Sequence, residues 1–378
     1  MRYLGFFVVA VLVMGASHRY VWARLVRDAG LPQPWSRVAT VAIVVLYVLL
    51  MGSFVLVRTL HRSIGAPLMW ITYTWLGVLF FMVLSLGLSD LARVITMRVQ
   101  GSGTIDDPER RMAISRLFAG GAAMLGLGAS AVGLASVLAP VAVKRVKVTL
   151  DRLTKASSGT RIVQLTDVHV GPTIGKAYVD QVVQRVNELD ADVVVITGDL
   201  VDGSVEDLKE HVAPLGTMKN KHGIYFVTGN HEYYSGAGAW IRYLESIGIK
   251  VLANEHVRIG GADGFDLVGI DDPSSGTQDL RKALEGREAD RACVLLSHQP
   301  RGIALAEKLG VDLQLSGHTH GGQLFPWNFM VRLQQPFVAG LHKLERAQIY
   351  VSSGTGYWGP PMRVGTSAEI TEIELLAS

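Results

Sequence analysis

The chain has 378 residues, 49% of them hydrophobic, and a formal net charge of +3. This length exceeds that of one average domain, so we expect at least two folded units. The small net charge gives no indication of a clustered basic face, and we therefore predict no nucleic-acid partner. Cys293 is the single cysteine, which excludes a disulfide within the chain; its apolar neighbours indicate a buried strand residue.

Four apolar stretches in the first third of the chain are long enough to cross a bilayer, which takes about 20 helical residues. They are residues 3–22, 38–57, 67–88 and 117–143. The last three contain no Asp, Glu, Lys, Arg or His, which argues against a transporter or proton relay. The first contains His18 and Arg19, and a cleaved signal peptide is its alternative interpretation. Because three spans follow it, we predict a retained helix and a four-helix transmembrane anchor over residues 1–143.

The arginines between these stretches favour one orientation in the membrane. With four spans, one side carries Arg19, Arg24, Arg27, Arg37, Arg93, Arg98, Arg110, Arg111 and Arg116, and the other carries the loop near Arg58 and Arg62. The positive-inside rule assigns the first group to the cytoplasm. The basic cluster Lys144, Arg145, Lys147 and Arg152 lies at the start of the C-terminal domain. By the same rule it favours a cytoplasmic position for that domain. We predict a multi-pass protein of the cell (inner) membrane with an extracytoplasmic C-terminal domain; a cytoplasmic domain is the alternative.

The remainder of the chain, after a predicted linker at residues 144–158, alternates between strand and helix patterns. Short apolar runs predict strands at residues 161–165, 193–196, 224–227, 265–268, 294–296, 313–315, 348–351 and 370–375. Apolar residues at helical spacing predict helices at residues 176–189, 205–215, 239–247, 280–284 and 303–309. This order predicts a layered α/β domain over residues 159–378.

Five of these strands end in a turn that carries metal-binding side chains. The turns are Asp167-Val168-His169, Gly198-Asp199-Leu200-Val201-Asp202, Gly229-Asn230-His231-Glu232, Ser297-His298 and Gly317-His318-Thr319-His320-Gly321. The carboxyl ends of strands are the usual ligand-binding edge of α/β sheets. A single such cluster is weak support for a site, but five in succession after apolar strands argue against coincidence.

These side chains suit phosphoester hydrolysis with two metal ions. Two ions about 3.5–4 Å apart can activate a water and neutralise the charge that develops on the phosphate. Mixed carboxylate and imidazole ligands favour borderline ions such as Mn, Fe or Zn over Ca.

The five blocks resemble the signature of the calcineurin-like metallophosphoesterase superfamily, and the helices ahead of them are similar to those of its bacterial membrane-bound branch. The resemblance covers residue 161 to the C-terminus and implies a two-sheet αββα sandwich. It implies that Asp167, His169 and His320 bind one metal ion and that Asn230, His298 and His318 bind the second. It further implies that Asp199 bridges both ions, and that His231 acts near the leaving group with Asp202 orienting it.

The predicted function is therefore that of a membrane-anchored, two-metal phosphoesterase acting on phosphodiester, phosphomonoester or pyrophosphate bonds by a metal-activated water. Its attachment to the bilayer suggests a lipid-linked phosphate substrate. A catalytically silent membrane scaffold or sensor is the alternative, but such proteins usually lose metal ligands, and here every expected ligand is present. Tyr233, Tyr234, Trp358 and Arg363 could line the substrate site, but packing or surface roles are the simpler expectation for them.

Overall fold

A computed structural model describes residues 2–56, 60–99 and 107–378 of the chain. The chain divides into two compact units. The first comprises residues 1–135 and 359–362, and the second comprises residues 136–358 and 363–378.

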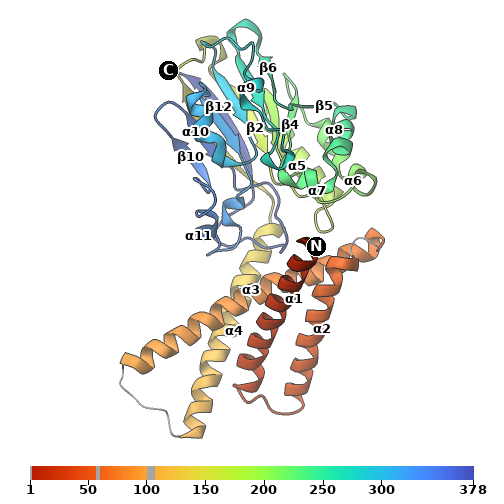
Figure 1. Ribbon diagram of the computed structural model, residues 1–378, viewed down its shortest axis with the longest axis vertical. Coiled ribbons are helices and arrows are strands. Elements are labelled where there is room, and N and C mark those ends of the chain that lie inside the picture. The colour runs from red at the N-terminus through yellow and green to blue at the C-terminus, as the bar shows by residue number, and fades with distance from the viewer. Residues whose placement is uncertain (1, 57–59, 100–106) are drawn as a thin grey trace. The chain divides into compact units, whose positions relative to one another are not determined.

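The first unit consists of four long helices (Figure 1). They are α1 (Arg2–Trp22), which continues into a π-helical turn (Ala23–Arg27), α2 (Trp35–Leu56), α3 (Arg62–Val99) and α4 (Pro108–Leu138). Val21, Leu79, Met82, Leu86 and Ala122 form a buried cluster that joins α1, α3 and α4. The remaining surface of these helices is rich in exposed Val, Leu, Ile and Phe, as expected for helices surrounded by lipid.

Three of these helices, rather than the four predicted spans, are long and apolar enough to cross a membrane within the described residues. These candidate spans are Trp35–Phe54, Arg62–Thr96 and Glu109–Leu138. The predicted stretch 3–22 does form a helix, α1, but this helix is not among them. It carries His18, whose ring is buried and accepts a hydrogen bond from Trp75 Nε1 at 2.8 Å. Val57, at the end of the second predicted span, and Arg58 lie outside the described residues.

The predicted linker at residues 144–158 begins instead as part of a sheet. Residues Ala142–Leu150 form β1, which pairs in parallel with β12 (Glu369–Ala377). Three basic side chains of β1 form ion pairs with glutamates of β12: Lys144 with Glu369, Arg145 with Glu372 and Lys147 with Glu374. Arg152 pairs with Asp312 at 2.8 Å. The basic cluster after the last span is therefore neutralised by carboxylates of its own domain.

Two six-stranded sheets form the centre of the second unit (Figure 1). The first has the order β1, β12, β2 (Thr160–Leu165), β3 (Val193–Thr197), β4 (Ile224–Val227) and β5 (Ile249–Val251). The second has the order β10 (Gly340–Lys343), β11 (Gln348–Val351), β9 (Leu313–Ser316), β8 (Cys293–Leu296), β7 (Phe265–Gly269) and β6 (Glu255–Ile259). Strands β2 to β5 are parallel, as are β7, β8, β9 and β11.

The core lies between the two sheets, with helices on their outer faces. Inward side chains such as Val195, Leu267 and Leu315 are fully buried in a single cluster. Helices α5 (Lys176–Asn187), α6 (Val205–Val212) and α8 (Ala237–Ser246) form one outer layer. Helices α9 (Leu280–Ala283) and α10 (Ile303–Lys308) pack on the second sheet, where Leu280, Ala283, Ile303 and Ala306 join Cys293, Leu295 and Ile349 in a second cluster. The predicted αββα sandwich is thus the observed architecture, and Cys293 is buried as expected.

The sequence patterns did not predict six elements of the structure. They are β1, β5, β6, β10, α7 (Asn230–Ser235) and α11 (Asn328–Val331). Edge strands such as β6 and β10 are half exposed, so they lack the continuous apolar runs that identify buried strands. Helix α7 consists mainly of polar residues and α11 of one polar and three consecutive apolar residues, so neither has apolar residues that repeat at helical spacing.

A buried carboxylate joins two arginines at the amino end of β7. Asp266 is 1% exposed and lies 3.1 Å from both Arg287 Nε and Arg291 Nε, whose side chains are also buried. Removing one partner from such a group leaves uncompensated charge in a low-dielectric interior, which typically costs about 3–5 kcal/mol.

We expect Asp266→Ala to lower the midpoint of thermal unfolding of the second unit by roughly 6–20 °C, from that cost and the usual size scaling. Asp180→Ala serves as the control, because the Lys176–Asp180 pair is exposed and contributes less than about 1 kcal/mol. Differential scanning calorimetry of the full chain in detergent measures both, and equal midpoints for the two variants would contradict the assignment.

Candidate metal centre

The predicted site residues converge at one edge of the sandwich. Asp167 follows β2, Asp199 follows β3, Asn230 begins α7 after β4, His298 follows β8, and His318 and His320 follow β9. Backbone hydrogen bonds tie adjacent turns together: Asp167 N donates to Gly198 O, and Gly317 N donates to His298 O. The parallel strands thus deliver side chains far apart in sequence to the same place.

The backbone at this edge is strained. Of the eight non-glycine residues with positive φ in the described part of the chain, five are predicted ligands: Asp167, His169, Asp199, His318 and His320. A non-glycine residue whose backbone adopts this left-handed conformation costs about 1–3 kcal/mol, and such residues cluster at functional sites. The geometry of the turns therefore positions these side chains at the expense of local backbone stability.

The first ligand group consists of Asp167, His169 and His320, whose ligand atoms lie within 4.8 Å of one another. His320 Nε2 is 3.1 Å from His169 Nε2 and 3.3 Å from Asp167 Oδ1. The backbone N–H of His318 donates to both oxygens of Asp167 at 3.0 Å and fixes that carboxylate.

The second ligand group consists of Asp199, His298 and His318. His298 Nδ1 lies 2.8 Å from Thr197 O, so Nδ1 carries the proton and donates it, which leaves Nε2 free as a ligand. His298 Nε2 is 3.2 Å from His318 Nδ1 and 3.1 Å from Asp199 Oδ2. Asn230 is the first residue of α7, and the next residue, His231, donates its backbone N–H to Asp199 Oδ1.

Asp199 lies between the two groups. Its Oδ2 is 3.1 Å from His298 Nε2, 3.9 Å from His231 Nε2 and 4.0 Å from His169 Nε2. Its Oδ1 accepts the backbone N–H of His231 at 2.9 Å. A Cβ on Gly229 would lie 2.2 Å from this oxygen, so the glycine is required for the carboxylate to occupy its place. Asp199 therefore lies within 4.0 Å of a histidine from each ligand group.

Asp202 contacts two imidazoles and not only the one that the sequence predicted. Its Oδ1 is 2.6 Å from His231 Nδ1, as expected for a group that orients His231. Both its oxygens also lie 3.2 Å from His169 Nδ1. One carboxylate therefore fixes the rings of His169 and His231 and directs the Nε2 atom of each into the site.

The residues present fit a pair of divalent cations. Asn230 Oδ1 is buried without a hydrogen-bond partner, and a metal ion would supply one. Two pairs of ring nitrogens approach to 3.1 and 3.2 Å, the separation of two ligands that each lie about 2.1 Å from one ion. Nitrogen and oxygen donors together suit Mn, Fe or Zn.

The electrostatics of the site also favour cations. Burial opposes the ionisation of Asp199 and Asp202, yet the imidazoles around them hold both pKa values well below the usual range. Burial lowers the pKa of His318 to about 3 and that of His320 well below its ordinary value, so both rings are neutral and present lone pairs. Burial raises the pKa of Asp167, so its ionised form needs a positive neighbour.

Glu232 is a structural residue of the site that the sequence analysis did not assign. Its buried carboxylate accepts the N–H groups of Gly229, Asp199, Leu200 and Val201 at 2.7–3.3 Å. It therefore fixes the turn that carries Asp199 to the start of α7. The signal that could have revealed it is a glutamate three residues after Gly229, at the position of a capping box.

Two aromatic side chains lie next to His231, and a buried arginine holds the turn of His320. The rings of Tyr234 and Trp358 lie 5.4 and 5.6 Å from the His231 ring and are mostly exposed. Arg363 is 1% exposed and donates to the carbonyls of Ser353, Gly356 and His320. Tyr234 and Trp358 can thus contact a substrate, whereas Arg363 is a packing residue that anchors the His320 turn.

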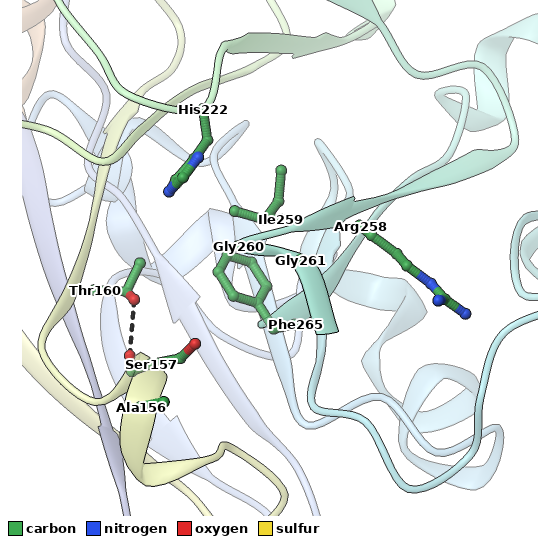
Figure 2. Close-up of a pocket in the computed structure, with 9 residues that line it drawn as sticks. All are labelled: Ala156, Ser157, Thr160, His222, Arg258, Ile259, Gly260, Gly261 and Phe265. Atoms are coloured by element: carbon green, nitrogen blue, oxygen red, sulfur yellow. Dashed lines mark hydrogen bonds between the residues drawn. The ribbon is translucent and has the colours of Figure 1, made fainter. Parts of the chain in front are cut away.

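A separate cavity of about 510 Å³ lies at the amino ends of β2 and β7, the edge opposite the ligand groups (Figure 2). It is lined by Ala156, Ser157, Thr160, His222, Arg258, Ile259, Gly260, Gly261 and Phe265. Arg258, its one permanently charged lining residue, is paired with Glu288 and extends away from the other side chains in Figure 2. The cavity contains none of the predicted site residues, and we assign it no ligand.

Comparisons with known proteins point to one family. The model of the calcineurin-like phosphoesterase family matches residues 160–322. A bovine (Bos taurus) transmembrane protein with metallophosphoesterase domain is 39% identical over 82% of this chain and 74% of its own. A zebrafish (Danio rerio) protein of the same name is 34% identical over 98% and 88%. An uncharacterised metallophosphoesterase of Campylobacter jejuni is 32% identical over 99% of both chains.

If Asp199 is shared by two ions, Asp199→Asn should reduce the bound metal from about two ions per chain to about one or none. His169, Asp202 and His231 form a third cluster of ligand atoms within 4.8 Å of one another. His231→Ala should nevertheless retain both ions, because Nδ1 of its ring is held by Asp202 and the first and second ligand groups do not include it. Elemental analysis of Mn-loaded full-length protein measures the occupancy. Full occupancy in Asp199→Asn, or depletion in His231→Ala, would reverse these roles.

Proposed function

Because the chain belongs to the calcineurin-like phosphoesterase family, we propose that it is a membrane-anchored enzyme that hydrolyses phosphate esters or pyrophosphates of lipid-linked molecules. The observation that carries the proposal is the position of Asp199 between two carboxylate–imidazole groups, with His231 beside them. A silent scaffold would not need to maintain nine convergent ligand and acid–base groups, five of them on residues with a strained backbone.

The metal ligands divide into two sets in this proposal. Asp167, His169 and His320 hold one ion, Asn230, His298 and His318 hold the other, and Asp199 serves both. When bound, two divalent ions of this kind lower the pKa of a water and neutralise charge on the phosphoryl oxygens.

His231 and Asp202 handle the proton of the leaving group. His231 Nε2 faces the site, 3.9 Å from Asp199 Oδ2, while Nδ1 is held by Asp202 at 2.6 Å. Asp202 stabilises the protonated imidazole, so His231 can donate from Nε2 to a departing oxygen or hold a phosphoryl oxygen by a hydrogen bond. The exposed rings of Tyr234 and Trp358 beside His231 leave that side open to a substrate.

The catalytic unit is proposed to lie outside the cytoplasm. Arg93, Arg98, Arg110, Arg111 and Arg116 lie near the junction of α3 and α4, and the positive-inside rule favours a cytoplasmic position for them. A single crossing by α4 then takes the chain to the other side, whatever the role of α1. The opposing basic cluster after α4 is neutralised by glutamates of β12 and by Asp312, which supports this orientation.

The activity is tested with a generic diester. Purified full-length protein should hydrolyse bis-p-nitrophenyl phosphate with added Mn, and EDTA should abolish the reaction, because both ligand groups depend on a cation. His231→Ala should lower kcat by about 10²–10⁴-fold, the usual contribution of one acid–base group. His222→Ala is the matched control, since this exposed histidine lines the cavity at the opposite edge. Rates unaffected by EDTA would contradict the two-metal proposal.

The orientation is tested by protease protection. In inside-out membrane vesicles, where the cytoplasmic face points outward, the catalytic unit should resist added protease until detergent opens the vesicle. In right-side-out vesicles the same unit should be digested at once. Digestion only in the inside-out vesicles would place the unit in the cytoplasm instead.

A further inference from the structure

An exposed hydrophobic segment follows the last metal-ligand turn. Phe325, Trp327, Phe329, Met330 and Leu333 lie within nine residues, and each is 50–77% exposed. We call residues 325–333 the apolar segment; it contains α11. Single exposed hydrophobic side chains are ordinary, but a concentration of large ones marks an interaction surface.

The apolar segment is physically joined to the metal centre. A Cβ on Gly322, two residues after His320, would lie 2.5 Å from the Cα of Asn328, so α11 packs directly on the backbone of the ligand turn. Gln323 exchanges two hydrogen bonds with the backbone of Trp358, at 2.8 and 3.0 Å. Trp358 in turn lies 5.6 Å from the ring of His231. A partner bound to the apolar segment would therefore lie next to the metal centre.

Most backbone N–H groups of this segment are hydrogen-bonded within the protein, as an apolar environment requires. The N–H groups of Trp327 and of residues 329–335 all donate to carbonyls of residues 324–331. Phe325 N donates to Val364 O at 2.9 Å. Unpaired backbone groups exclude most loops from lipid, and most N–H groups of this loop are paired.

The charges around the segment are positive. Residues 321–341 contain no Asp or Glu. Arg332 lies over the Phe329 ring, and Arg301 donates to the carbonyl of Gln334, the residue that follows the segment. Neither arginine has a carboxylate partner among the ion pairs of the described residues, unlike the basic side chains of β1. Exposed apolar side chains next to unpaired arginines suit a partner with an apolar interior and anionic groups at its boundary.

The chain itself supplies such a surface, because its own helices place it in a bilayer. Only residues 139–141 separate the end of α4 from the start of β1, and each residue spans at most about 3.6 Å. Aromatic and aliphatic side chains flanked by arginine are typical of segments buried about 5–10 Å into the headgroup boundary.

We propose that the apolar segment, with Arg301 and Arg332, docks into the interface of an anionic leaflet and holds the metal centre at the level of lipid headgroups. The docking proposal depends only on the exposed side chains and charges of this segment. Its consequence, that the enzyme selects phosphates attached to membrane lipids rather than soluble ones, rests on the proposed function.

The test uses full-length protein in nanodiscs of phosphatidylcholine and phosphatidylglycerol with brominated acyl chains, which quench tryptophan fluorescence at short range. Subtracting the spectrum of Trp327→Phe isolates the emission of Trp327. That emission should be quenched relative to unbrominated nanodiscs, whereas the emission isolated with Trp240→Phe should not, because Trp240 lies in the protein core.

A second variant, Phe329→Ser/Met330→Ser/Leu333→Ser, separates docking from catalysis. Losing these contacts should reduce the docked fraction by roughly tenfold or more, with a matching loss of Trp327 quenching. Leu305→Ser, an exposed leucine on α10, should change neither quenching nor hydrolysis of bis-p-nitrophenyl phosphate.

The two proposals fail in different ways. Trp327 emission unaffected by brominated lipid, as expected if the segment binds another protein or a second copy of the chain, would overturn docking even with full diester activity. Equal quenching in the triple variant would also overturn it. Quenching without diester activity would leave docking supported and refute the proposed function instead.

Discussion

The site depends on holding one carboxylate, that of Asp199, at the place where the ends of parallel strands meet. Asp199 has a left-handed backbone, its N–H is bound by buried Glu232, and its side chain occupies space left free by Gly229. Each of these features is costly or restrictive for stability alone. Together they place one negative charge within 4.0 Å of three imidazoles from three different turns.

The elements that could be predicted are those whose burial requires a recognisable pattern of apolar residues. Strands buried on both faces need continuous apolar runs, so β3, β4 and β8 were predicted within one residue of their bounds. The metal-ligand turns directly follow such runs, and their residue types suit cations; all the residues predicted from them gather at one edge. The assignment of individual roles remains a proposal that metal analysis must test.

What could not be predicted depends on contacts between distant segments. β1 is recognisable as a strand only through its pairing with β12, more than 200 residues away, so the segment looked like a charged linker. The same pairing neutralises Lys144, Arg145 and Lys147, whose sequence position alone favours a cytoplasmic domain. Glu232 and the second contact of Asp202, with His169, escaped for the same reason: both act through segments about 30 residues away.

These contacts suggest a division of labour in the catalytic unit. The basic side chains of β1 are paired with glutamates of β12. Arg301 and Arg332, which have no carboxylate partner among the ion pairs of the described residues, lie at the apolar segment, and this segment packs on the turn of a metal ligand. In our account the helices confine the enzyme to a membrane, and the apolar segment determines how its metal centre meets the lipid.

The central claim, that two ions share Asp199, is tested most directly by anomalous diffraction from crystals of the Mn-loaded protein. The account predicts two anomalous peaks about 3.5–4 Å apart. One should lie among Asp167, His169 and His320, the other among Asn230, His298 and His318, with Asp199 between them. A single peak, or two peaks that Asp199 does not join, would contradict it.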